Sequence, residues 1–200
     1  MIPFNRTRPM LTGACVCAAL LLPIATGARA QTGCAPESFT AAAVSRADGD
    51  AGAGLRIDIH VAAWTVEREK IRLVHVLAER GTAAFANALA ESMPVGEIRA
   101  AGRRPSPVRF AWQERLDDGG RRLLLITDRT LAYWTDMVRP AGEPDTFTLI
   151  EIRIPLGCEG EGKVGSASDV RVNRNFGVIE LTDYDAAPVR LTNVITGCMP

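Results

Sequence analysis

The sequence predicts an α+β fold: a mainly antiparallel β-sheet of about seven to nine strands, curled or barrel-like, with one inserted helical hairpin. Short alternations of apolar and polar residues recur along most of the chain, and turns rich in Gly, Pro, Asn and Asp separate them. The sequence Asp-Asp-Gly-Gly at 117–120 joins two such alternations, which is typical of a β-hairpin. Helical periodicity occurs in two adjacent stretches, 66–80 and 82–92.

The first half of the domain is expected to contain two strands and then the helices. Residues 39–47 predict a weak strand, whereas residues 55–61 predict a clear one, because apolar residues alternate there with Arg, Asp and His. Thr65 offers an N-cap for the first helix, and Gly81 offers its stop. The second helix follows at once and ends before Pro94, so we expect a helical hairpin.

The rest of the chain predicts strands joined by short turns, which favours antiparallel pairing. In one of them, Ile150 and Ile152 alternate with Glu151 and Arg153, so this sheet is expected to have one face in water. We expect the last four strands to pair in sequence order as a meander. The expected strands cover residues 95–102, 108–116, 121–128, 147–154, 163–172, 177–184 and 189–196.

The N-terminal thirty residues have the pattern of a signal peptide. Arg6 and Arg8 precede an apolar stretch, and Ala-Arg-Ala at 28–30 is a small-x-small cleavage site, so we expect a cut between Ala30 and Gln31. A transmembrane anchor and lipidation at Cys15 are the weaker alternatives. Residues 31–200 are then a single periplasmic or secreted domain, with no integral membrane segment left after cleavage.

The charge balance argues against a nucleic-acid-binding protein. The whole chain carries 23 basic and 23 acidic residues, and loss of the three arginines before the expected cut leaves 20 against 23, a net charge of about −3. Nucleic-acid-binding domains usually carry a basic stripe. One cluster of arginines lies between Glu97 and Glu114, and we interpret it as a solvated loop. Its members are Arg99, Arg103, Arg104 and Arg109.

Three cysteines remain after the expected cut, and an exported protein favours a disulfide between two of them. In the expected meander, Cys158 and Cys198 lie at opposite ends of the sheet, too far apart for a cystine. If the first and last strands are neighbours, Cys34 and Cys198 meet, so we predict this pair, with Cys34–Cys158 as its rival. None of the three forms a C-x-x-C pair, and we predict neither a metal nor a cofactor.

The strongest candidate for ligand binding is the segment after the expected strand 121–128. Asp128, Arg129, Tyr133 and Trp134 mix charge with aromatic rings where the chain interrupts the sheet. Together with the indole rings of Trp64 and Trp112, they could line a pocket for an apolar or sugar ligand. In the alternative interpretation, the aromatic residues cover the core and Asp128 caps the turn.

Several phrases of the sequence resemble an uncharacterised family of secreted or periplasmic bacterial proteins. The similar region runs from about Trp64 to Val194. The resemblance implies a one-domain exported protein with no assigned activity, so it transfers no catalytic or ligand-binding residue. The cysteines lie outside the pattern, and a disulfide would be this protein's own addition. The phrases are LITDRTLAYW, FTLIEIRI, GEGK, IELTDYDAAPVRLTNV and VGEIRAAG.

The sequence thus favours a non-enzymatic exported domain, a monomer that binds an unknown small ligand or envelope protein. The chain has only two histidines, and its serines do not lie in a G-x-S-x-G pattern. No catalytic residue is therefore predicted. One alternative is a hydrolase of unknown substrate that uses Asp128 with His60. The other is a structural envelope component that assembles through sheet edges.

Overall fold

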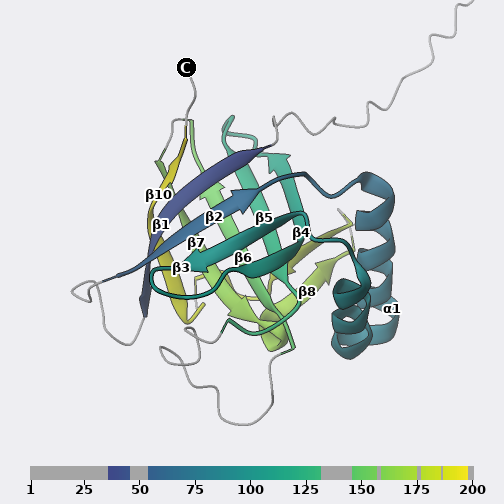
Figure 1. Cartoon of the computed structure of the whole chain (residues 1–200). Coiled ribbons are helices and arrows are strands. Elements are labelled where there is room, and N and C mark those ends of the chain that lie inside the picture. The colour runs from purple at the N-terminus through teal and green to yellow at the C-terminus, as the bar shows by residue number, and fades with distance from the viewer. Residues whose placement is uncertain are drawn as a thin grey trace, which may run out of the picture. The chain divides into compact units, whose positions relative to one another are not determined.

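A computed structural model gives the fold, and it describes residues 36–45, 54–131, 146–156, 159–174, 177–185 and 187–197 (Figure 1). All of them belong to one compact unit, residues 31–200. This part of the chain contains every described helix and strand and both hydrophobic clusters, so it carries its own core.

Eight strands close into an antiparallel barrel in the order β1-β10-β7-β6-β5-β4-β3-β2. The mainly antiparallel architecture predicted from the sequence is therefore confirmed, and the sheet closes because β1 pairs with both β2 and β10. The barrel strands are β1 (Glu37–Ser45), β2 (Leu55–Val61), β3 (Gly96–Ala100), β4 (Ser106–Arg115), β5 (Arg121–Thr127), β6 (Thr148–Ile154), β7 (Glu159–Ser166) and β10 (Val189–Thr196).

The predicted meander of the last four strands is wrong. Strands β8 (Val170–Asn173) and β9 (Val178–Leu181) form a separate two-stranded sheet, and β7 pairs with β6 and β10 instead. The chain leaves the barrel at Ser166, whose backbone N–H and hydroxyl both donate to Asp169 Oδ2 at 2.9 Å. This local turn, the 3-10 helix η2 (Ala167–Asp169), divides the expected strand 163–172 into two.

The predicted helical hairpin is replaced by one helix, α1 (Glu67–Glu91), which is kinked at Gly81. Gly81 has φ 78° and ψ −178°, a conformation essentially restricted to glycine, and the helix resumes without a connecting loop. The kink returns the end of the helix to its beginning: Arg72 Nη2 lies 3.1 Å from Ser92 Oγ. A straight helix would separate residues twenty positions apart by about 30 Å.

The sequence predicted that Thr65 caps the helix, but Thr65 does not do so. The N-cap is Val66, which makes no side-chain capping bond. Thr65 instead accepts the N–H of Ala111 through its hydroxyl at 2.9 Å, and its own N–H donates to Ala111 O at 2.8 Å. These two hydrogen bonds join the start of α1 to β4. Thr65, a residue type that is common at helix N-caps, therefore makes a tertiary contact instead.

The barrel interior is a packed apolar core. The inward side of each strand contributes buried side chains such as Phe39, Ile59 and Leu125. An eight-stranded barrel is just wide enough for its side chains to fill. At one end, an ion pair crosses the interior between Glu37 on β1 and Arg121 on β5, with Nη1–Oε2 at 2.9 Å.

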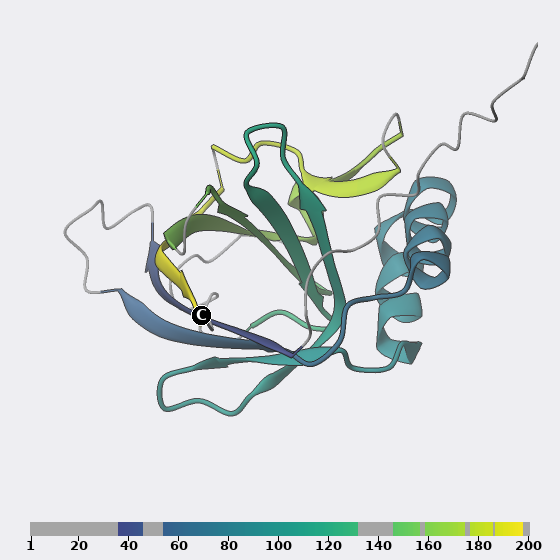
Figure 2. The ribbon, with the colours of Figure 1, turned by 90° about the horizontal axis from the view of Figure 1, so that it is seen from above.

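A second apolar cluster lies outside the barrel wall. There, α1 and the β8–β9 sheet cover strands β4 to β7 (Figure 2). Phe85 of α1 meets Phe147 edge to face, with ring centroids 5.1 Å apart, while Ile179 and Leu181 of β9 are also buried in this cluster. No described helix is long and apolar enough to cross a membrane.

The strand register changes the argument about cystine pairing. β1 and β10 are antiparallel neighbours, as the pair Cys34–Cys198 requires. However, Ile195 also lies opposite Glu159, so the start of β7 and the end of β10 are at the same end of the barrel. The predicted separation of Cys158 from Cys198 depended on the meander, which does not form. The three cysteines themselves lie outside the described residues.

Candidate functional site

The turn after β5 contains two residues of the predicted ligand site, and both are engaged in ion pairs. The side chain of Asp128 is only 5% exposed. Its Oδ2 accepts from Arg109 Nε at 2.8 Å, and its Oδ1 accepts from Arg129 Nε at 2.9 Å. Arg109 also donates to the backbone oxygen of Ser92 at 2.7 Å. Asp128 therefore joins β4, β5 and the end of α1, and its carboxylate already has two cationic partners.

The same turn closes one end of the barrel. Leu131 is 1% exposed and belongs to the interior cluster. Its N–H donates to Thr148 Oγ1 at 3.2 Å, and the Thr127 hydroxyl donates to the carbonyl of Arg129 at 2.7 Å. Hydrogen bonds of Thr127 on β5 and Thr148 on β6 thus hold the turn. The alternative interpretation of the sequence had assigned this role to the side chain of Asp128. Tyr133 and Trp134, the other predicted ligand-binding residues, lie outside the described residues.

The ion pairs determine the charge state of Asp128. Burial alone would raise the pKa of Asp128, but the hydrogen bonds from Arg129 and Arg109 outweigh it and lower the pKa below its ordinary value. The ionised carboxylate is therefore the form that the fold selects, and it acts as a structural anion in this turn.

We expect Asp128→Asn to lower the free energy of unfolding by about 2 kcal/mol near neutral pH, because Arg109 loses a partly buried charged partner. Since the folded pKa is depressed, the ionic contribution is complete above the unfolded value of about 3.9 and is lost as pH falls through the folded pKa. Urea unfolding at a series of pH values measures this difference between wild type and variant.

The expected difference is therefore full near pH 7 and shrinks below about pH 4. Asp117→Asn is the matched control, because Asp117 is exposed, and it should change stability by less than about 0.5 kcal/mol. A loss for Asp128→Asn that stays constant down to about pH 3 would rule out an ionic role.

The structure does not pair His60 with Asp128, as the hydrolase hypothesis requires. His60 is exposed on β2, and its Nδ1 lies 3.1 Å from Ser38 Oγ on β1. Strands β2 and β5 are separated by β3 and β4, which places them about 14 Å apart along the sheet. The Ser38–His60 pair lies on an open strand surface, and the side chain of the neighbouring Glu97 binds Arg99 instead.

The predicted aromatic pocket is also divided by the barrel wall. Trp64 packs against the interior cluster, whereas Trp112 packs against the cluster outside the wall. Within the described part of the chain, no group of three or more His, Cys, Asp or Glu side chains could hold a metal ion.

A network of buried charges lies between the barrel wall and β9. Glu151 is 1% exposed, although the sequence placed it on a wet face. Its Oε2 accepts from Arg122 Nη2 at 2.9 Å, and its Oε1 accepts from Arg153 Nη2 at 2.9 Å. Arg122 also donates to Glu114 and to the carbonyl of Ile179 in β9. Polar side chains therefore help to seat the β8–β9 sheet.

Arg122 has its guanidinium buried within this network. Its Nε lies 2.9 Å from Glu151 Oε1, within ion-pair distance, but at an angle that forms no hydrogen bond. Burial alone would lower the pKa of Arg122, yet Glu151 and Glu114 outweigh it and raise the pKa. The guanidinium of Arg122 is thus charged, and Glu151 is its main buried partner.

Tyr184 covers the edge of the network. Its ring lies 3.8 Å from the guanidinium carbon of Arg153 and 5.3 Å from Lys163 Nζ. Burial raises the pKa of Tyr184, and the nearby carboxylate of Glu161 acts in the same direction. The phenol is therefore neutral, and its ring lies against the cationic side chains of Arg153 and Lys163.

The described surface has a shallow hollow between α1 and β9, over β4 and β5. It measures about 260 Å³ out to open solvent, but its enclosed part holds only about one water molecule. Lys70 Nζ stands 4.1 Å from the ring centroid of Trp112 and 3.1 Å from Glu67 Oε1. Glu114 and Arg122 at its floor are paired with each other. The hollow therefore lacks the room of a small-molecule site.

The outer side of β1, β2 and β3, here called the open face, is not covered by any described element (Figure 1). The register sets its side chains in rows across the three strands. One row is Ser38, His60 and Glu97, and the next is Thr40, Asp58 and Arg99. These side chains are half-buried or exposed and polar, so a wet sheet face lies on these strands, whereas the sequence predicted it at residues 147–154, where Glu151 is buried.

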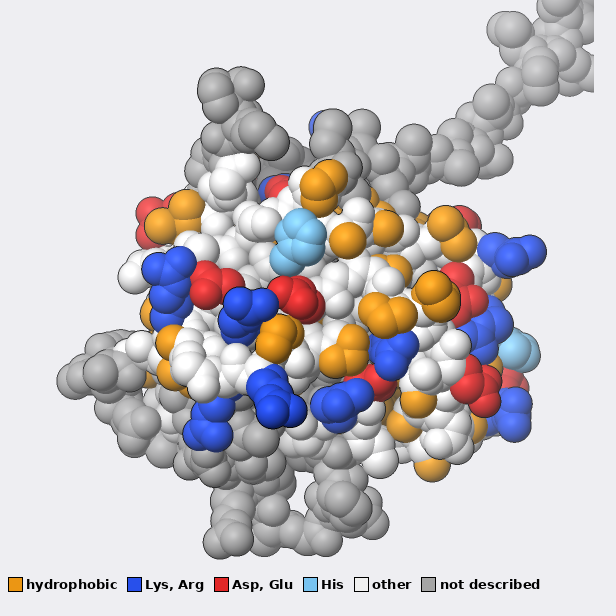
Figure 3. All heavy atoms as spheres, viewed as in Figure 1, with side chains coloured by type: hydrophobic (Ala, Val, Ile, Leu, Met, Phe, Trp, Pro, Cys, Tyr) orange, Lys and Arg blue, Asp and Glu red, His pale blue; other side chains and the backbone are white. Residues whose placement is uncertain are grey.

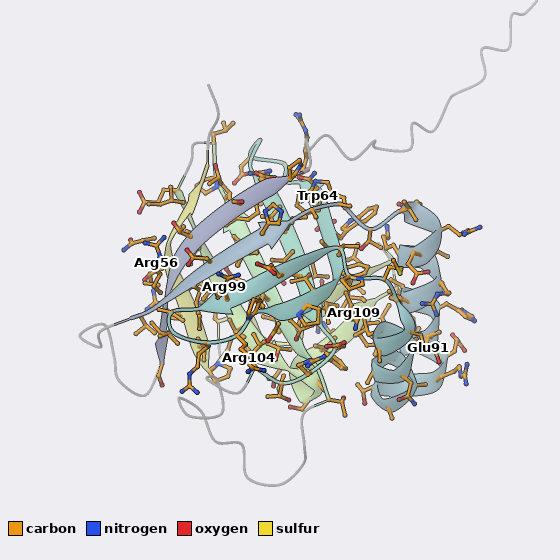
Figure 4. All side chains as sticks on the ribbon, in the orientation of Figure 1. Arg56, Trp64, Glu91, Arg99, Arg104 and Arg109 are labelled. Atoms are coloured by element: carbon orange, nitrogen blue, oxygen red, sulfur yellow. The ribbon has the colours of Figure 1, made fainter. Side chains whose placement is uncertain are left out.

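Arginines gather at one end of the open face, where β2 begins and β3 ends. The carbonyl of Arg56 accepts the N–H of Ala101 at 3.0 Å, which places the loop after β3 beside the start of β2. Figure 4 shows the labelled arginines of this region, and Figure 3 shows basic side chains over the same part of the surface. We define the arginine patch as Arg56, Arg99, Arg103 and Arg104.

Comparison of the chain with models of protein families, with curated proteins and with solved structures finds no match.

Sequence reasoning found part of the candidate surface and missed the rest. It noted three of the four arginines in the patch but assigned them to a solvated loop. It missed Arg56, whose place beside that loop depends on the pairing of β2 with β3. A sequence signal existed, because Arg56 and Asp58 alternate with the apolar residues of a clear strand.

Proposed function

We propose that the protein is an exported, non-enzymatic binding domain that engages its partner through the open face. The observation that carries this proposal is the contrast between the two sides of the barrel wall. The interior is filled with apolar side chains, and α1 with the β8–β9 sheet covers β4 to β7. The open face presents charged side chains, and no described element covers it.

Export is supported by the signal-peptide pattern of residues 1–30. A domain in the periplasm or outside the cell meets envelope components, and a surface of exposed polar rows suits reversible recognition of such a partner.

The two alternative functions have weaker support from the geometry. A hydrolase needs a nucleophile, a base and an oriented acid at a concave site, whereas Ser38 and His60 form a pair on an exposed surface. A component that assembles through sheet edges needs free strand edges, and closure of the barrel leaves its eight strands without them. Strands β8 and β9 provide the outer edges in the described part of the chain.

Site-specific photo-crosslinking in living cells tests the proposal. A benzophenone amino acid at Thr40, in the middle of β1 on the open face, should give a discrete adduct, because this position would lie against the partner. The same amino acid at Arg80, an exposed position of α1, is the matched control and should give little adduct. Equal adducts at both positions, or none at Thr40, would contradict binding through the open face.

A further inference from the structure

The barrel closes without the β8–β9 sheet, which lies outside it. The chain leaves β7 at Ser166 and returns to β10 at Val189, yet β7 and β10 are direct neighbours, with Val164 opposite Val189. The strand pairs that close the barrel therefore involve no residue of the segment 167–188. Displacement of the β8–β9 sheet would break no hydrogen bond between barrel strands.

The β8–β9 sheet also has hydrogen bonds of its own. β8 and β9 pair along their full length. At the base of the sheet, the N–H of Thr182 donates to the carbonyl of Asp169 at 2.6 Å. On its surface, Arg171 Nε donates to Glu180 Oε1 at 2.8 Å. These bonds stay intact when the sheet moves as a unit.

Part of the interface between this sheet and the barrel wall is apolar and includes Leu181. A Cβ atom at Gly165 would lie 2.4 Å from Leu181 Cδ2, so the leucine fills space that a glycine leaves open on β7. Leu149 of β6 lies opposite Gly165 in the strand register and is 0% exposed. Movement of Leu181 away from the wall would therefore bring solvent to Leu149.

The rest of the interface contains charged side chains. Glu151, Lys163 and Arg122 are only 1%, 7% and 9% exposed, and Arg122 Nη2 donates to the carbonyl of Ile179 in β9 at 3.2 Å. Burial removes the hydration of these ions, and opening of the interface restores it. This interface is therefore less costly to open than the apolar interior of the barrel. The hollow beside Ile179 also brings solvent to one margin of it.

The helix α1, which covers the same side of the barrel, is attached differently. At its start, Thr65 exchanges two hydrogen bonds with Ala111 of β4. At its end, Arg109 of β4 donates to the carbonyl of Ser92 at 2.7 Å. Both ends of α1 are thus joined to a barrel strand, and we expect the helix to stay in place when the β8–β9 sheet moves.

We propose that the β8–β9 sheet is a movable cover, which opens as a unit while the barrel stays folded. In the open state, Leu149 reaches solvent beside Arg122 and Glu151. The cover therefore controls access to a part of the wall that combines apolar and charged groups. This part lies on β5 to β7, away from the open face, so the inference is independent of the proposed function (Figure 2).

Thiol labelling at matched buried positions tests the inference. Leu149→Cys places a thiol beneath the cover, Ile150→Cys places one in the barrel interior, and Leu89→Cys places one on the buried side of α1. All three positions are 0% exposed. Leu124→Cys, on the same outer side of β5 and opposite Glu151, is a second probe beneath the cover.

Each variant of the compact unit 31–200 is treated with a thiol reagent at several low urea concentrations. Peptide mapping by mass spectrometry scores the introduced cysteine separately from the native ones, and circular dichroism establishes that the variants remain folded. The thiols beneath the cover should react at least about 100-fold faster than those of Ile150→Cys and Leu89→Cys, because local opening costs less than global unfolding. Their rates should depend only weakly on urea, since local opening exposes little surface.

Two results would overturn the inference. Equal rates at all positions, with the same steep dependence on urea, would show that the covered wall meets solvent only when the whole domain unfolds. Equally fast labelling of Leu149→Cys and Leu89→Cys would show that α1 leaves the wall as well, so that the β8–β9 sheet is not a separate cover.

Discussion

Glu151→Ala should lower the free energy of unfolding by about 3–5 kcal/mol, because it leaves the buried guanidinium of Arg122 without its main partner. The Glu151 side chain is only 2% exposed, so water cannot replace the lost contacts. Urea unfolding followed by fluorescence and circular dichroism measures the change. A loss of this size is comparable with a large part of the total stability of a domain.

Two further variants show whether the loss comes from the uncompensated charge. Glu161→Gln removes a carboxylate at an exposed position of β7 and should change stability by less than about 0.5 kcal/mol. The double variant Glu151→Leu with Arg122→Met removes both buried charges and should recover at least half of the loss. If the double variant is as unstable as Glu151→Ala, the cost arises from lost packing and the ionic explanation is wrong.

Leu131→Ala is expected to destabilise the protein by about 3 kcal/mol, because it opens a cavity at the end of the barrel core. Leu131 follows a strand in a segment that contains charged residues, yet it is 1% exposed and packs with the interior side chains. Its backbone bond to Thr148 would survive the substitution, so the lost energy reports on the side chain alone. The measurement is again the free energy of unfolding in urea.

Leu156→Ala is the matched control for this prediction. Leu156 is 79% exposed, and its truncation should change the free energy of unfolding by less than about 0.5 kcal/mol. If Leu131→Ala is as mild as the control, the turn after β5 does not close the barrel. The turn after β5, which the sequence predicted as a ligand site, would then have no structural role in the barrel either.

Much of the β-structure could be predicted because alternation of apolar and polar residues reports directly on strands. The hairpin at 117–120 joins β4 and β5, and the strand expected at 55–61 coincides with β2. Gly81 was rightly identified as a break in helical geometry. The sequence could not reveal that one glycine bends a single helix, because a stop and a kink have the same local signal.

The candidate site was harder to predict because its parts come from distant segments. Asp128 was chosen for its charge beside aromatic residues, but Arg109 and Arg129 occupy its carboxylate. The patch forms only when β3 and its loop lie beside β2, and the alternation that exposes Arg56 does not reveal this pairing. Residue type thus identified charged groups, and strand pairing decided which of them meet.

The sequence by itself determined the strand-rich class, the antiparallel direction of the strands and the break at Gly81, since these follow from local periodicity and backbone conformation. The tertiary structure alone decided which of the polar faces stays wet. Glu151 and Asp58 both alternate with apolar neighbours, but β9 covers the region of Glu151, whereas no described element covers Asp58. A period of two assigns a side chain to one face of a sheet, and only long-range packing determines what lies against that face.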